Sequence, residues 1–197
     1  MKLFNTWDIS TVKVQEEALK PYIFINPVLA LRSGGRAASG QRVWVQKTNI
    51  VERLMNKLMV PGHRGKKHKL SSYHCTGKSC NVYKIVKEAF DIIEKETKEN
   101  PIQVFVKAVE NGAPREEVTG IEYGGARYSK AVDISPLRRV DLVLRWMVQG
   151  SYGKSFNSKK KIAKTLSEEI LNAYKLDQGS NAISKKLESE RQSDSSR

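Results

Sequence analysis

Lysine and arginine are concentrated in one region of the chain, where they could bind phosphate groups. From Ala18 to Lys87 the sequence contains fourteen cations and a single acid, Glu52, whereas the whole chain of 197 residues has a net charge of +14. A region of one sign indicates a partner of the opposite sign, and nucleic acid is the first candidate. Anionic lipid is the second, although no run of 18 apolar residues predicts a membrane span.

A glycine-rich basic stretch from Arg32 to Arg42 lies inside this region. It has few side chains to bury and cannot fold alone, so it is either a flexible surface loop or an arm that becomes ordered on a phosphate surface. Because no acid lies between Glu17 and Glu52, we favour the binding arm.

Histidine and cysteine side chains that could bind a metal ion gather just after this stretch. They are His63, His68, His74, Cys75 and Cys80. Zinc prefers such ligands, but the spacing of the two cysteines is slightly longer than usual and no second cysteine pair exists. A zinc site formed by His74, Cys75 and Cys80 is therefore the minor alternative to solvated side chains in a basic loop, and we expect no cofactor.

Signatures of catalysis are missing from the sequence. It contains no glycine-rich dinucleotide or nucleotide-phosphate loop, no HExxH and no GxSxG motif. The sequence therefore predicts a protein that is not an enzyme. Its N-terminus lacks the uninterrupted apolar core of a secretory signal, and two cysteines do not make a disulfide framework, so we expect a cytoplasmic protein.

The residues from 100 to 146 predict the elements that would position these cations. Asn100 and Pro101 form a helix start, and Gly112 ends that helix. Two β-prone runs follow, Val118–Tyr123 and Arg127–Ile134.

The link between these runs is Gly124-Gly125, which tolerates positive φ and favours a tight hairpin turn. We expect a positively charged hairpin that projects between two helices and reaches into an anionic partner. Ser135 and Pro136 then start the next helix.

Apolar residues at helical spacing predict six helices in all. The expected helices begin at Thr48 or Asn49, span Asn81 to Lys98, begin at Asn100 and at Ser135, span Ser158 to Tyr174, and span Ala182 to Arg191. The apolar stripes of these helices are most simply core, and the paired acids Glu168-Glu169 are most simply helix-end or surface charge.

The predicted fold is therefore mainly α: a helical bundle of about six helices with a protruding β-hairpin arm and a basic N-terminal extension. We expect the extension to span residues 1–48 and to be partly ordered on RNA. The helical domain is expected at 49–192, with the hairpin at about 115–134, followed by a frayed tail at 193–197.

Five stretches together are specific to one protein family. They are Ile85–Phe90, Asn100–Val104, Ala113–Thr119, Ala131–Pro136 and Arg138–Asp141. The chain resembles the universal small-subunit ribosomal protein seven, the S-seven family, in its archaeal and eukaryotic form, from about Lys2 to the C-terminus. The sequence departs from the family in about ten extra residues after Pro61-Gly62, and at Ser79, where the family usually has a third basic residue.

The resemblance implies a structural protein of the small ribosomal subunit in the cytoplasm. It implies binding to the 3′ major domain of the small-subunit rRNA, organisation of the head, and a hairpin near the exit-site tRNA and the mRNA path. The implied partners also include neighbouring head proteins, with no membrane and no obligate homo-oligomer.

The candidate RNA contacts are cations of the arm, loops, helices and hairpin, together with the glycines and tyrosines at the hairpin turn. They are Arg32, Arg36, Arg42, Lys47, Arg53, Lys57, Arg64, Lys66, Lys67, Lys69, Lys78, Arg115, Tyr123, Gly124, Gly125, Arg127, Tyr128, Lys130, Arg138, Arg139, Lys159, Lys160 and Lys161.

Two of these groups have alternatives. Tyr123 and Tyr128 could stack on bases, but cross-strand packing within the hairpin explains them at least as well. The lysines from Lys159 to Lys161 oppose the dipole of the helix expected to start at Ser158, a conflict that a phosphate would remove. An exposed charged turn is an equal alternative.

Two other functions are less well supported by the sequence. A DNA-binding protein would read sequence with a compact helix pair, whereas a hairpin and a glycine–arginine arm fit RNA better. An RNA-modifying enzyme would need a cofactor loop or an acid–base pair.

Overall fold

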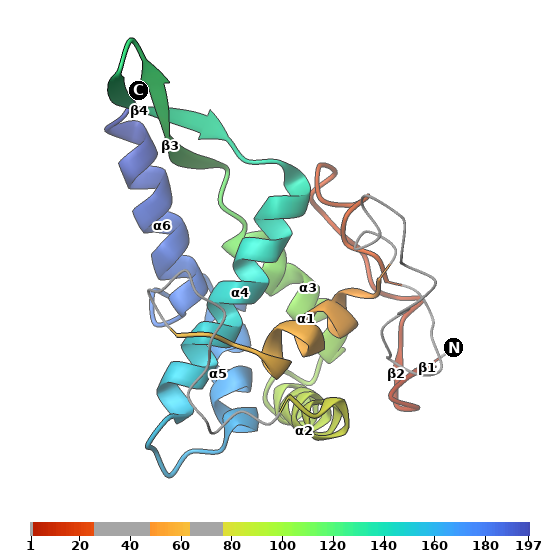
Figure 1. Cartoon of the computed structure of the whole chain (residues 1–197). Helices are drawn as coiled ribbons and strands as arrows, with labels where there is room; N and C mark the ends of the chain where they lie inside the picture. The colour runs from red at the N-terminus through yellow and green to blue at the C-terminus, as the bar shows by residue number, and fades with distance from the viewer. Residues whose placement is uncertain (1, 26–47, 64–76) are drawn as a thin grey trace.

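The computed structural model describes residues 2–25, 48–63 and 77–197, and these form one helical bundle with a projecting hairpin (Figure 1). The mainly α fold with a β-hairpin arm is confirmed. In chain order the elements are β1 (Lys2–Leu3), β2 (Trp7–Asp8), α1 (Ile50–Met59), α2 (Ser79–Thr97), α3 (Pro101–Gly112), β3 (Glu116–Tyr123), β4 (Ala126–Asp133), α4 (Pro136–Ser155), α5 (Ile162–Tyr174) and α6 (Asn181–Asp194).

The hydrophobic core lies between the helices, as their apolar stripes predict. Phe90 of α2, Phe105 of α3, Leu144 of α4 and Ile170 of α5 are all fully buried. Burial of each such side chain stabilises the fold by about 2 kcal/mol. The bundle is therefore a rigid base for the segments that leave it.

Two of the predicted helix starts are formed as expected. The side chain of Asn49 accepts a hydrogen bond from the backbone N–H of Val51 at 2.9 Å, at the start of α1. Asn100 accepts from Ile102 N–H at 3.1 Å, with Pro101 in the first turn of α3. Ser135 precedes α4, but its hydroxyl makes no such capping bond.

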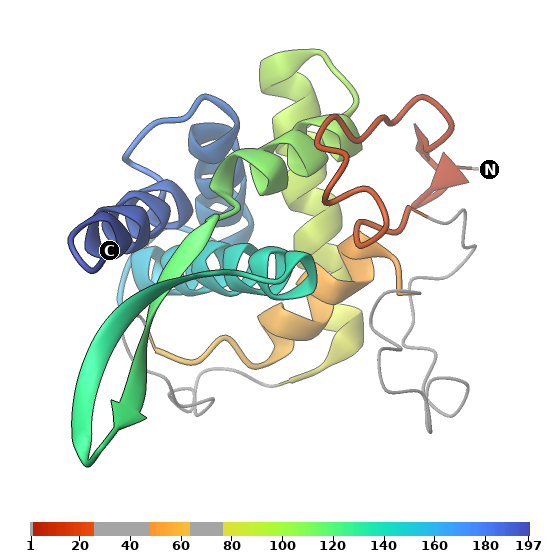
Figure 2. The same ribbon diagram turned by 90° about the horizontal axis from the view of Figure 1, so that it is seen from above.

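The first residues of the chain belong to the core, which the sequence did not predict. Leu3, Phe4 and Trp7 are almost fully buried. The Phe4 ring lies 4.7 Å from Tyr83 of α2, and the Trp7 ring lies 5.8 Å from Phe90, measured between ring centroids. Residues 2–25, here called the N-terminal strap, therefore pack on the bundle, on the side away from α6 (Figures 1 and 2).

Side chains of α3 hold the middle of this strap. Gln103 accepts a hydrogen bond from Lys13 N–H at 2.8 Å and donates one to the Lys13 carbonyl at 3.1 Å. Glu110 accepts from the backbone N–H groups of Gln15 and Glu16 at 2.6 and 3.1 Å. These bonds satisfy main-chain groups of a segment that has no strand partner there.

The end of the strap turns instead of running extended. Ile23 N–H donates to the Leu19 carbonyl at 3.0 Å and closes a turn. The turn buries Leu19 and Ile23 against the core.

Glu169, expected to be surface charge, is fully buried. Its carboxylate accepts hydrogen bonds from Lys154 Nζ of α4 and from Ser180 Oγ, each at 2.8 Å. It also accepts from the backbone N–H groups of Asn181 and Ala182, at the start of α6. A carboxylate is favourable at the N-terminus of a helix, so this single side chain joins α4, α5 and α6.

The boundaries of the last two helices differ from those expected. The helix α5 begins at Ile162, because the Ser158 hydroxyl accepts a hydrogen bond from Lys160 N–H in a turn and does not cap a helix. The helix α6 continues to Asp194, into the segment expected to be frayed, and Ser193 is fully buried.

Candidate nucleic-acid interface

The hairpin has the geometry that its turn residues predict. β3 and β4 pair antiparallel in continuous register from Glu116 opposite Asp133 to Tyr123 opposite Ala126. Gly124 and Gly125 form the turn with φ of +58° and +81°, values that residues with a Cβ rarely adopt. The hairpin extends well beyond the bundle (Figure 2).

One face of the hairpin carries exposed rings. Since side chains alternate along a strand, Ile121, Tyr123, Ala126 and Tyr128 share this face. Tyr128 lies opposite Ile121, which is the cross-strand pair expected from the packing alternative. Tyr123 lies opposite the small Ala126 and is 81% exposed, so its ring is free to stack on a base.

The other face of the hairpin carries Arg127, which lies across Gly120. A Cβ added at Gly120 would come within 2.5 Å of Arg127 Nε, so a larger residue there would make this flexible side chain shift. Arg127 also lies opposite Glu122 in the strand register.

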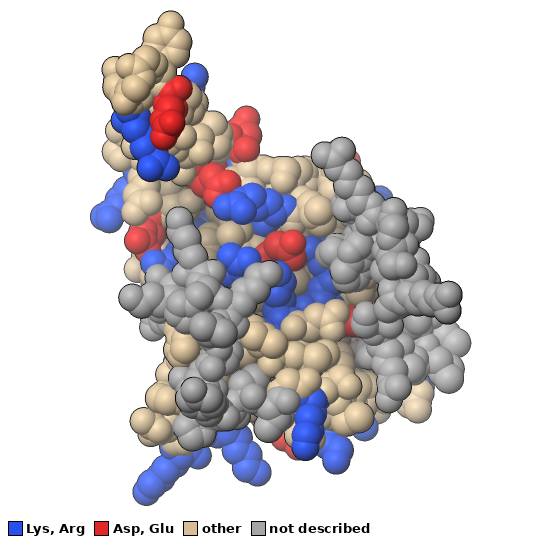
Figure 3. Space-filling model, in the orientation of Figure 1, with Lys and Arg blue, Asp and Glu red and all other residues tan. Residues whose placement is uncertain are grey.

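The prediction of a positively charged hairpin is wrong. Between residues 116 and 133 the chain carries four acids and two cations. Figure 3 shows the hairpin tip as largely uncharged. The rings of the tip, more than its charge, could therefore attract RNA.

Arg53, which was predicted to contact RNA, is buried within the bundle and paired with other parts of the chain. It is 3% exposed, pairs with Asp141 at 3.2 Å and donates to the Tyr22 carbonyl at 2.9 Å. Burial lowers the pKa of Arg53, an effect that Asp141 opposes. Lys57, which is half-buried, lies 3.7 Å from the same carboxylate.

Arg139, also predicted to contact RNA, is likewise buried. It pairs with Glu16 of the strap at 2.7 Å and donates to the Pro114 carbonyl at 2.9 Å. Its neighbour Arg138 is exposed but makes two hydrogen bonds to Glu117, at 2.7 and 2.8 Å. These bonds raise the pKa of Arg138 and keep it charged.

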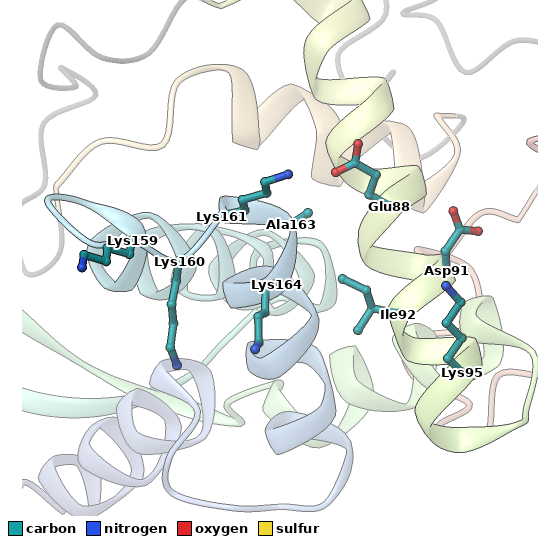
Figure 4. Close-up of a pocket in the computed structure, with 9 residues that line it drawn as sticks. All are labelled: Glu88, Asp91, Ile92, Lys95, Lys159, Lys160, Lys161, Ala163 and Lys164. Carbon is teal, nitrogen blue, oxygen red and sulfur yellow. The ribbon is translucent and has the colours of Figure 1, made fainter.

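A groove between α2 and the start of α5 gathers lysines from separate parts of the chain (Figure 4). We call it the lysine groove; its volume is about 570 Å³. It is lined by Glu88, Asp91, Ile92, Lys95, Lys159, Lys160, Lys161, Ala163 and Lys164. Figure 3 shows basic side chains at the lower edge of the molecule, where Figure 1 places α5 and α2.

The charges of the lysine groove are unevenly paired. Lys160 lies 3.2 Å from Glu168. Within the described part of the chain, Lys159, Lys161 and Lys164 are exposed and take part in no ion pair. The positive end of the α5 dipole points the same way, so phosphate is the group that this surface suits.

The sequence analysis did not select two of the lysines in this groove, Lys95 and Lys164. Lys164 follows Lys160 and Lys161 at helical spacing, a signal that could have been used. Lys95 lies in the groove because α2 packs against α5, and no local sequence pattern predicts that contact.

The remaining predicted contacts divide into two sets. Lys78, Arg115 and Lys130 are exposed. The others lie outside the described residues: Arg32, Arg36, Arg42, Lys47, Arg64, Lys66, Lys67 and Lys69.

The minor alternative of a zinc site falls largely outside the described residues. His74 and Cys75 lie there, and Cys80 is exposed in the first turn of α2. Across residues 2–25, 48–63 and 77–197, no three potential metal ligands converge. No helix within these ranges has the length and apolar character needed to cross a bilayer.

The chain is similar over its whole length to archaeal proteins named small ribosomal subunit protein uS7. The protein of Nanoarchaeum equitans is 53% identical over 197 residues, covering 100% of this chain and 99% of the relative. That of Thermoplasma volcanium is 45% identical and covers 99% of this chain and 100% of the relative. That of Methanothermobacter thermautotrophicus is also 45% identical, covering 96% and 95%.

A family model described as ribosomal protein S7p/S5e matches residues 35–197. The matched part includes the hairpin, the lysine groove and the six helices found among the described residues. Its members are ribosomal proteins and not enzymes, which confirms the prediction that the chain does not catalyse a reaction. The resemblance inferred from the sequence is confirmed as well: the chain belongs to the ribosomal protein S7p/S5e family.

Proposed function

We propose that this protein is a structural component of the small ribosomal subunit, in the cytoplasm, and that it binds rRNA of the 3′ major domain and helps to organise the head. The hairpin is proposed to lie near the exit-site tRNA and the mRNA path, with other head proteins as neighbours. Its relatives are named as small ribosomal subunit proteins, which supports its place in that subunit.

The lysine groove is the observation that carries the RNA-binding proposal. Lys159, Lys161 and Lys164 remain exposed without ion pairs among the described residues, whereas the buried arginines of the bundle are paired inside the protein. Each lysine that neutralises a phosphate releases condensed counterions, so such a surface gives affinity that falls steeply with salt. The groove would fix the position of the protein on RNA without reading its sequence.

The basic stretches of the first half of the chain would add to this contact. The cations from Arg32 to Lys47 and from Arg64 to Lys69 have almost no acids near them in the sequence. We propose that the cations of the extension from 1 to 48 contribute phosphate contacts through the part that follows the strap, and that the body from residue 49 onward contributes the lysine groove.

The hairpin would contribute in a different way. Its tip is nearly neutral, so Tyr123 would act by stacking on an unpaired base and Arg127 by contacting the backbone. The glycine turn adds little bulk and lets the tip approach RNA closely.

A triple variant tests the lysine groove. Lys159, Lys161 and Lys164 are replaced by Gln, and binding to the 3′ major domain of the small-subunit rRNA is titrated at several salt concentrations. We expect affinity to fall about tenfold or more and the slope of log K against log salt to flatten by about two to three.

The matched control replaces Lys13, Lys98 and Lys175, which are exposed elsewhere on the body, by Gln. The net charge changes by the same amount, so any general charge effect is shared. Equal salt slopes for both triple variants would count against the groove, and tighter binding to duplex DNA than to the RNA would favour a DNA-binding protein instead.

A further inference from the structure

The base of the hairpin is held from two sides by different helices. Glu116 and Glu117 are neighbours in β3, so their side chains point to opposite faces of the strand. Glu117 receives two hydrogen bonds from Arg138 of α4. Glu116 pairs with Arg197, which follows α6. Two adjacent acids thus tie one strand to two helices.

The helix α6 also contacts the main chain at this base. Ser189 Oγ donates a hydrogen bond to the Glu116 carbonyl at 3.0 Å. Glu190 accepts one from the backbone N–H of Arg115 at 3.2 Å. The C-terminal half of α6 therefore runs alongside the start of β3, as Figure 1 shows.

The second arginine of α4 reaches the chain just before the strand. Arg139 donates to the Pro114 carbonyl and pairs with Glu16, so it joins the base of the hairpin to the N-terminal strap. Arg138 and Arg139 are adjacent in α4, and together they contact the chain at residues 114 and 117.

Beyond this base, little holds the hairpin. Its residues from Thr119 to Lys130 are all exposed. A lone two-stranded hairpin is only marginally stable, so its direction depends on what grips its base. Ile134 N–H donates to the Arg115 carbonyl at 2.9 Å and closes the base of the hairpin. This bond joins two residues of the hairpin itself, so it cannot fix the direction of the hairpin relative to the bundle.

We infer that Arg138 and Arg139 are positioning residues that, with Glu116, Glu117 and the C-terminal half of α6, set the direction in which the hairpin leaves the bundle. Both arginines were predicted from the sequence to bind RNA; here their partner is the protein itself. The inference rests on the proposed function only in that a fixed direction matters when the hairpin must meet RNA.

Distance measurements on the free protein test this inference. Spin labels are attached at Ala126→Cys near the hairpin tip and at Glu96→Cys on α2, in a protein whose Cys75 and Cys80 are replaced by Ser. We expect a narrow distance distribution in the parent. The distribution should be about twofold broader when Arg138→Gln or Glu117→Gln removes the ion pair between α4 and β3.

A charge swap and a matched control sharpen the result. The double variant Glu117→Arg with Arg138→Glu should restore the narrow distribution, because it re-forms the pair with reversed charges. Lys130→Gln removes a cation from the hairpin itself and should leave the distribution unchanged. Thermal melting of each variant shows that the bundle remains folded.

The outcomes separate positioning from RNA contact. An unchanged distribution in both single variants, or equal broadening in Lys130→Gln, overturns the inference. RNA titration of the same Arg138→Gln protein then completes the comparison: a loss of affinity without any broadening assigns Arg138 to phosphate. Because the distances are measured without RNA, failure of the proposed RNA binding leaves this test intact.

Discussion

The helical bundle and the hairpin use their charged residues in opposite ways. In the bundle, Arg53, Arg139 and Glu169 are buried, and each is paired with a group of opposite charge. In the outer half of the hairpin, Arg127 is exposed, and among the described residues the bonds from the bundle to the hairpin lie at its base. Residue type alone therefore does not distinguish a cation that holds the fold from one that meets a partner.

Burial makes the difference, because a charge removed from water must be paired inside the protein. The lysine groove lies between the two cases: it is part of the bundle, yet all five of its lysines are exposed. We expect substitutions in the bundle to act on stability, and substitutions in the hairpin and the groove to act on RNA binding.

The largest loss of stability is expected for Glu169→Ala. It leaves Lys154 without its carboxylate partner and removes the buried acceptor of the Asn181 and Ala182 N–H groups at the start of α6, so the free energy of unfolding should fall by about 3–5 kcal/mol. Urea denaturation measures the loss. The control Glu168→Ala, which removes an exposed pair with Lys160, should cost no more than about 1 kcal/mol, and equal losses would contradict the distinction.

The next largest effect is expected in the N-terminal strap. Trp7→Ala removes a buried ring that packs on Phe90 and donates a hydrogen bond to Glu94, and should lower the free energy of unfolding by about 3 kcal/mol. The neighbouring control Lys13→Ala removes only an exposed side chain. If Trp7→Ala unfolded with the same free energy as the parent, the strap would not contribute to the stability of the core.

A smaller effect, of opposite sign, is expected for Glu52→Gln. Burial raises the pKa of Glu52 above its value in the unfolded chain, so the stability it contributes is complete below the unfolded pKa and is lost as pH rises through the folded pKa. At pH near 7 the Gln variant should be more stable than the parent by about 1 kcal/mol.

The difference between Glu52→Gln and the parent should vanish near pH 4, below the ordinary pKa of Glu. Denaturation at both pH values measures it. The exposed Glu96→Gln should show no such dependence, and a Gln variant that is less stable at neutral pH would mean that the Glu52 carboxylate makes a needed contact.

The smallest effect on stability is expected at the hairpin tip. Replacing Glu122–Arg127 by Asn-Gly joins the facing residues Ile121 and Tyr128 through a shorter turn and should change the free energy of unfolding by less than about 0.5 kcal/mol. In reconstituted small subunits, we expect the variant to bind rRNA but to bind exit-site tRNA more weakly than the parent. If the variant no longer melted cooperatively, the hairpin tip would be needed for folding.

Much of the fold follows from local sequence signals. Asn49 and Asn100 cap helices, and Gly124-Gly125 form the turn, because each of these features depends on a few neighbouring residues. The start of α5 was misplaced because the Ser158 hydroxyl bonds within a turn, a competing local use of the same residue type.

The candidate site was less predictable. The charge imbalance before Lys87 directed attention to the cations as a group, and this group included Arg53, whose partner Asp141 lies 88 residues away. Lys95 joined the lysine groove only through helix packing. Pairing between distant residues leaves no trace in a local pattern.

The sequence by itself determined that the chain forms a helical bundle with a hairpin whose turn is formed by two glycines. Five of its stretches also indicated the family. Only the tertiary structure decided which charges face inward: it buried Glu169, tied Arg138 and Arg139 to the base of the hairpin, and docked the strap on α3. Helix caps and turns depend on neighbours in the chain, whereas burial depends on neighbours in space.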